Sequence, residues 1–270
     1  RPWNALSLSL AQDGAINKLR SNLPDCPFPT RYTSLTAFNA RYRQGMVTAT
    51  GSLIYTNITE RVKVGDAPAD FQRLAPSFTV SLQPWQEQLF FLRLMYKSTF
   101  RTPTFNDLYY YRLGNRSLRP EKANEYNIGI TWSKPFVSFL NYFSVTIDGY
   151  YNDVTDKIVA FPTTYAWKMA NYGKVRATGI DATLAAATSL SKNITLVISG
   201  GYTFQKAIDL TDPTSKSYKD QLPYTPEHSG NVSAILEMPW VNVGYSIVGV
   251  SERYSMSQNI PENRIDGYME

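Results

Sequence analysis

The sequence predicts an all-β protein, an antiparallel up-and-down meander of about eleven strands that belongs to a larger transmembrane β-barrel. Three observations predict it. Aromatic residues make up 14% of the chain, and such residues favour strands and membrane-interface girdles. Apolar and polar residues alternate in segments of about 9–11 residues, the length of a tilted strand that crosses a bilayer. Short and long connections alternate between these segments.

The alternating segments define the strands that we expect. They lie near residues 3–10, 33–43, 46–56, 75–83, 89–99, 122–132, 143–153, 175–186, 194–204, 230–237 and 241–252. In one of them Val145 and Ile147 alternate with Thr146 and Asp148, so one face suits lipid and the other water. The polar phase also includes charged residues, which a dry core would not accept without partners. These are Arg41, Arg43, Arg93, Lys97, Asp148, Asp181 and Glu237.

The connections fall into two classes. Those expected at 44–45, 84–88, 133–142, 187–193 and 238–240 are short, and those at 11–32, 57–74, 100–121, 154–174 and 205–229 are long. In an antiparallel meander alternate connections lie at opposite ends, as in outer-membrane barrels with short periplasmic turns and long extracellular loops. Trp85, Trp132 and Trp240 lie at or beside short turns, where an interfacial girdle would place them.

Other function classes find little support in the composition. No stretch approaches the roughly 18 apolar residues that a membrane-spanning helix needs. The 27 basic residues, with a net charge of +5, are scattered, which disfavours nucleic-acid binding. His228 is the only histidine and Cys26 the only cysteine. We therefore expect no enzyme, no metal site and no cofactor.

One segment carries a family resemblance. Residues 100–109 read FRTPTFNDLY, and Gly-Asn, Leu and Pro-Glu follow in order before the next strand. This pattern resembles the barrel signature of TonB-dependent outer-membrane receptors, with a weaker element near Gly179. The positions that carry the resemblance are Phe100, Arg101, Pro103, Asp107, Leu108, Gly114, Asn115, Pro120, Glu121 and Gly179.

The resemblance implies a fold and a function. Residues 1–270 would be part of a closed barrel of about 22 strands in the bacterial outer membrane, in contact with lipid and lipopolysaccharide. A plug domain coupled to the TonB complex would gate the import of a bulky nutrient such as an iron–siderophore, haem or cobalamin. No plug domain and no terminal aromatic strand are recognisable in the chain, so we expect a barrel fragment. The alternative is a soluble or surface-anchored β-rich carbohydrate-binding module.

The same segment supplies the candidate site. Pro103 and Pro120 end regular strand pairing, and Glu121 is expected to meet Arg101 or Arg119 at the base of the loop, so the signature is interpreted mainly as architecture. The predicted ligand-binding residues are Tyr109, Tyr110 and Arg112. Aromatic and guanidinium groups can hold a large anionic nutrient by stacking and charge. The competing interpretation is a basic outer surface that faces lipopolysaccharide.

Overall fold

The computed structural model describes residues 5–22, 26–85, 88–136, 140–162 and 167–270, and almost all regular structure in them is β. The long strands are β1 Leu6–Lys18, β2 Thr30–Gln44, β3 Val47–Arg61, β4 Phe71–Leu82, β5 Leu89–Arg101, β6 Glu121–Pro135, β7 Leu140–Pro162, β8 Trp167–Ser191, β9 Ile194–Asp209, β10 His228–Glu237 and β11 Asn242–Val250. All eleven expected strands are present. No helix in the described residues is long and apolar enough to span a membrane.

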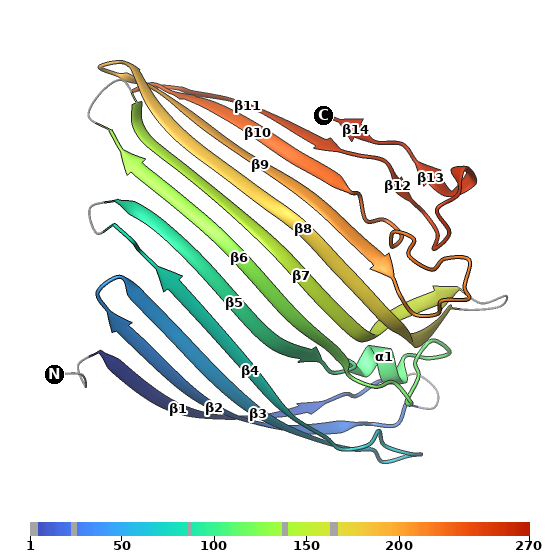
Figure 1. Ribbon diagram of the computed structural model, residues 1–270. Helices are drawn as coiled ribbons and strands as arrows, with labels where there is room; N and C mark the ends of the chain where they lie inside the picture. The colour runs from blue at the N-terminus through green and yellow to red at the C-terminus, as the bar shows by residue number, and fades with distance from the viewer. Residues whose placement is uncertain (1–4, 23–25, 86–87, 137–139, 163–166) are drawn as a thin grey trace.

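The strands form one curved antiparallel sheet (Figure 1). Each strand from β1 to β11 pairs with its neighbours in the sequence, and the short strand β14 (Tyr268–Met269) pairs with β11 at the edge of the sheet. A separate two-stranded ladder joins β12 (Arg253–Tyr254) to β13 (Arg264–Ile265). The expected meander is confirmed, with the addition of β14, and the sheet is not closed between β1 and β14 in the described residues.

Several strands are longer than the sequence predicted. The expected loop at 154–174 is mostly strand, because β7 runs to Pro162 and β8 begins at Trp167; its central residues 163–166 lie outside the described part. Residues 154–161 include Val154, Ile158 and Val159, which favour a pleated strand, and pairing continues beyond them. Strand β1 likewise extends to Lys18 and shortens the first loop.

The sheet has one apolar and one polar face, and the strand register keeps them continuous. Ile147 is paired with Ile130 on β6 and Ala182 on β8, and Ile147 is 46% exposed. On the other face, Asp148 is paired with Gly129 and Asp181. The two predicted faces are therefore confirmed, and the large apolar side chains form an exposed surface of the kind that contacts a membrane.

Aromatic pairs mark both ends of the apolar face. Near the short turns, the ring centroids of Trp132 and Phe143 are 5.5 Å apart. Near the long loops, those of Tyr126 and Tyr151 are 6.1 Å apart. Tyr151 follows Phe143 by eight residues of β7, which is about 26 Å of strand and about 20 Å of height at a tilt of about 40°. This height agrees with the apolar band of an outer-membrane barrel, about 25 Å.

The connections are sorted between the two ends of the sheet. Gly45 has φ +54°, which permits the two-residue turn between β2 and β3. At the opposite end, the helix α1 (Phe105–Tyr109) lies in the connection between β5 and β6 (Figure 1). A small hydrophobic cluster of Leu108, Leu118 and Ile158 forms there. The loop end of the sheet therefore has a packed core, which positions the candidate site.

Candidate functional site

The signature segment folds into a capped helical turn between β5 and β6. The Thr104 hydroxyl accepts a hydrogen bond from the Asp107 amide at 3.1 Å, and the Asp107 carboxylate accepts one from the Thr104 amide at 2.8 Å. This reciprocal pair is a capping box, which satisfies two amides that the short helix α1 leaves free. Pro103 is buried before the helix, and Leu108 is buried within it. The residue types of the signature thus determine the local shape.

Ion pairs tie the base of the loop together. The Arg101 guanidinium lies 3.4 Å from the Asp107 carboxylate and 3.5 Å from that of Glu121. The Glu121 carboxylate also accepts a hydrogen bond from the Ile158 amide at 3.2 Å, so it holds the strand extension of β7. Of the two partners expected for Glu121, the structure has Arg101. Arg119 instead pairs with Asp156 at 2.6 Å.

A second attachment joins the loop to the wall formed by β2 and β3. Glu60 accepts hydrogen bonds from the Tyr109 hydroxyl and the Arg31 guanidinium, and the Arg31–Glu60 ion pair is 2.7 Å long. The two charged side chains are only 14% and 5% exposed. Arg31 also donates to the Pro103 carbonyl at 2.8 Å and lies over the Phe105 ring. The loop is therefore fixed to strands that are distant in the sequence.

This attachment lies on the polar face of the sheet. Arg31 precedes Tyr32, whose side chain belongs to the exposed apolar face, and consecutive strand residues point to opposite faces. Arg31 and Glu60 are direct cross-strand partners, so both face the polar side. Burial and the Glu60 carboxylate raise the pKa of Tyr109 above its ordinary value. The phenol is therefore held in its neutral, donating form.

The predicted ligand-binding residues occupy different surroundings. Tyr109 is partly buried and bonded to Glu60. Tyr110 is 55% exposed, and Arg112, with φ +63°, is also exposed and stacks over the Tyr111 ring at 5.1 Å. The structure thus places Tyr110 and Arg112 on the open surface of the loop and Tyr109 in its attachment. Their role in ligand binding stays a prediction.

The glycines of the signature allow close approaches. A Cβ atom at Gly114 would lie 2.7 Å from the Leu108 carbonyl, so only glycine fits beneath the end of α1. The neighbouring Asn115 side-chain amide donates to the Met169 carbonyl at 3.0 Å. On β8, a Cβ atom at Gly179 would lie 2.5 Å from the Tyr150 hydroxyl. These contacts indicate that Gly114, Asn115 and Gly179 stabilise the local structure by close packing and hydrogen bonding.

A cavity of about 250 Å³ adjoins the loop. Its polar lining comes from β2, β3 and the loops at 62–70 and 102–120. The lining includes Arg31, Glu60, Asp70, Arg116 and Arg119. Arg31 is paired with Glu60 and Arg119 with Asp156, whereas Arg116 forms no ion pair with a residue that the structure describes and can meet a ligand group with acceptor oxygens. The described residues contain no group of three or more His, Cys, Asp or Glu placed to hold a metal ion.

The polar wall carries an ion pair that the sequence did not predict. Arg93 on β5 and Asp148 on β7 lie 2.9 Å apart across the intervening strand β6. The residue between them is Gly129, where a Cβ atom would collide with the Asp148 carboxylate. A glycine inside a strand is a signal for such a close approach. Asp181 continues the row on β8 and accepts a hydrogen bond from Thr203 at 2.7 Å.

His228 begins β10 and lies on the apolar side of the sheet with its aromatic neighbours. Its ring nitrogen Nδ1 lies 2.7 Å from the Tyr202 hydroxyl, and its ring packs against Phe204 with a centroid distance of 5.2 Å. His228 is exposed, and its ring contacts at this strand end are with the two aromatic side chains of β9.

Comparisons with known proteins agree with this fold. Residues 7–269 match the family described as TonB dependent receptor-like, beta-barrel. The vitamin B12 transporter BtuB of Vibrio vulnificus is 36% identical over 84 residues, which are 30% of this chain and 13% of that protein. BtuB of Photobacterium profundum is 29% identical over 97 residues, 34% of this chain and 15% of that protein.

Solved structures extend the likeness across the chain. The copper transporter OprC superposes with a TM-score of 0.70 at 15% identity, covering 99% of this chain and 44% of that chain. The FrpB iron transporter of Neisseria meningitidis superposes with a TM-score of 0.63 at 16% identity, covering 91% of this chain and 38% of that chain. At these identities the likeness concerns the fold, and this chain spans less than half of each. Because the family match covers residues 7–269, the chain belongs to the TonB-dependent receptor β-barrel family.

Proposed function

We propose that this chain forms part of the wall and outer loops of an active-transport receptor in the bacterial outer membrane. The receptor would import a scarce, bulky nutrient such as an iron–siderophore, haem or cobalamin. A plug domain outside residues 1–270 would gate the barrel, and the TonB complex would supply the energy. The family is one of transport receptors and not of enzymes, which supports this general function.

One observation carries the proposal, namely the two-faced sheet. Its apolar face, exposed along β1 to β11, suits lipid, whereas its polar face holds Arg93, Asp148 and Asp181 and suits a water-filled interior. The alternative, a soluble carbohydrate-binding module, would need a layer that covers the apolar face. The described residues form one large sheet and a two-stranded ladder, and they provide no such layer.

Ligand recognition is proposed for the open surface of the loop between β5 and β6. Tyr110 and Arg112 are the candidates that the loop leaves exposed, and Tyr109 would contribute by fixing the loop. Arg112, together with Arg116 of the neighbouring cavity, favours a nutrient that is anionic or rich in acceptor oxygens. Loops presented by a rigid scaffold commonly carry binding residues.

The test is uptake by cells that carry the full-length receptor. Deletion of the receptor gene should abolish uptake of one labelled nutrient from a panel of ferric siderophores, haem and cobalamin, and loss of TonB should have the same effect. The double variant Tyr110→Ala/Arg112→Ala should then bind that nutrient about tenfold more weakly, a loss of about 1.4 kcal/mol.

Glu237→Ala, which removes an exposed side chain near a short turn, serves as the control and should bind normally. If cells without the receptor gene and cells without TonB still take up every nutrient in the panel, the transport proposal is contradicted. If the double variant assembles correctly and binds the nutrient with normal affinity, the assignment of Tyr110 and Arg112 is contradicted. The transport proposal would then still stand.

A further inference from the structure

The apolar face has an open groove at its loop end. The groove has a volume of about 750 Å³, and its lining is drawn from β4 to β9. Gly149 lies between Ile128 and Ile180 in the register of the sheet. Because Gly149 has no side chain, the surface is lowest there, and the two isoleucines border the depression. A Cβ atom at Gly149 would meet Ile128 at an ordinary 3.6 Å, so a side chain could occupy this space.

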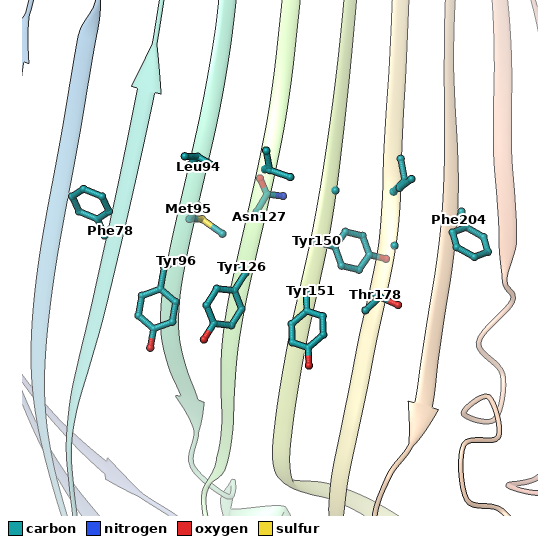
Figure 2. A pocket seen from close by; sticks show the side chains of 14 residues that line it. Phe78, Leu94, Met95, Tyr96, Tyr126, Asn127, Tyr150, Tyr151, Thr178 and Phe204 are labelled. Atoms are coloured by element: carbon teal, nitrogen blue, oxygen red, sulfur yellow. The ribbon is translucent and has the colours of Figure 1, made fainter.

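Aromatic side chains border the groove on the side of the long loops. Tyr96, Tyr126 and Tyr151 are cross-strand neighbours, and the ring centroids of Tyr96 and Tyr126 are 5.1 Å apart. Figure 2 shows these three rings side by side, with their hydroxyl groups pointing the same way, toward the end at which β5 stops. Tyrosines in this arrangement mark the boundary between lipid chains and headgroups.

Positive charge gathers beyond this tyrosine row. Lys122 on β6 and Lys174 on β8 are both paired with Thr155 on β7, so they flank one position. Thr155 follows Tyr151 by four residues on the same face, about 13 Å further along the strand. Neither lysine forms an ion pair with any residue that the structure describes.

An arginine connects the lysines to the tyrosine row. Arg176 on β8 lies between the lysines and the tyrosine row, with its guanidinium 5.1 Å from the centroid of the Tyr151 ring. It also forms a 3.3 Å ion pair with Asp153. Asp153 thus offsets one positive charge of the cluster. The two lysines remain available for an anion that approaches from the membrane side.

We infer that this face holds a specific site for a phosphate-bearing lipid of the outer leaflet. One acyl chain would lie in the groove over Gly149, between Ile128 and Ile180, and the headgroup phosphate would meet Lys122 and Lys174. The inference rests on the proposed outer-membrane function. Charge complementarity selects the occupant, because an apolar groove below an uncompensated pair of lysines matches an acyl chain below a phosphate.

A matched control exists on the same face of the sheet. Lys18 on β1 and Arg61 on β3 are both paired with Thr30 on β2, at the same end of the strands and with the same spacing. Both are exposed, and the 750 Å³ groove does not extend to these strands. A general attraction to anionic lipid would use both pairs of cations equally, whereas the inferred site uses only Lys122 and Lys174.

The experiment measures lipid retained by the full-length receptor in detergent, by native mass spectrometry. Dioleoyl phosphatidic acid is titrated into the receptor. Two further probes are dioleoylglycerol, which lacks the headgroup phosphate, and inorganic phosphate, which lacks the acyl chains. The double variant Lys122→Ser/Lys174→Ser should bind phosphatidic acid about tenfold more weakly or worse. The groove-filling variant Gly149→Phe should lose binding to a similar extent, and Lys18→Ser/Arg61→Ser should stay within about twofold of wild type.

Equal losses in the two cation variants, or unchanged binding in Gly149→Phe, would overturn the inference. So would inorganic phosphate binding as tightly as phosphatidic acid. A wild-type receptor that inserts in membranes and imports its nutrient, yet retains no phosphatidic acid, would overturn this inference and leave the proposed function intact. A protein that does not insert in membranes would overturn the proposed function, and the inference with it.

Discussion

Replacement of Glu60 by alanine should release the loop between β5 and β6 from the wall of the sheet. Glu60 is the acceptor for both Arg31 and Tyr109, and its side chain is 5% exposed. Removal of one partner from a buried ion pair costs about 3–5 kcal/mol. Because Arg31 keeps its bond to the Pro103 carbonyl and its contact with Phe105, we expect the lower value, about 3 kcal/mol. Opening of the loop should then become more than about 100-fold more frequent.

Hydrogen–deuterium exchange of the full-length receptor measures this opening, since the amides of Leu108 and Tyr110 are bonded within the α1 turn. Exchange of the peptide that spans 104–116 should accelerate more than about 100-fold in Glu60→Ala. Tyr109→Phe, which removes one hydroxyl, should produce about a fivefold change. The control Glu237→Ala should exchange within about twofold of wild type. The same result in Glu60→Ala would refute the proposed attachment of the loop.

Two further predictions concern the signature loop and the polar wall. Asp107→Ala removes the capping box and one Arg101 ion pair, so the opening free energy of the α1 amides should fall by about 1 kcal/mol, less than in Glu60→Ala, and exchange should accelerate accordingly. Gly129→Ala should displace the Arg93–Asp148 ion pair, because its Cβ atom occupies the position of the Asp148 carboxylate. A double-mutant cycle measures this by the free energy of unfolding in denaturant. Asp148→Asn should lower that free energy by about 1 kcal/mol in the wild-type background and by close to zero in the Gly129→Ala background. Equal losses in the two backgrounds would contradict the contact.

Much of the fold was predictable because its signal is local. The alternation around Ile147 has the period of a strand with one face in lipid, and it appears in the sequence without any knowledge of partners. The sequence does not predict the extensions of β7 and β8, because beyond Asp153 the polar residues no longer alternate regularly. Pairing between the two long strands, and not periodicity, maintains the extended backbone there.

The site was predictable only in part. The sequence indicated that the residues around Arg101 and Glu121 shape a loop, and their ion pair is present. It did not indicate that Arg31 and Glu60 fasten this loop, because the contact joins strands separated by many residues. The register that brings them together is set by the whole sheet. For the same reason the sequence alone does not assign a role to Gly129, which depends on Arg93 and Asp148 on the two neighbouring strands.

The central claim is that the two faces of the sheet meet lipid and water, and one pair of variants tests it directly. Ile147 lies midway between Phe143 and Tyr151 on the apolar face, and Thr146 lies beside it on the polar face, bonded to Thr131 at 3.1 Å. The measurement is the free energy of reversible unfolding of the full-length receptor in bilayers. Ile147→Arg should destabilise the barrel by about 2–4 kcal/mol, as expected for arginine at the bilayer midplane, and Thr146→Arg by less than about 1 kcal/mol. Equal stability of the two variants would contradict the account.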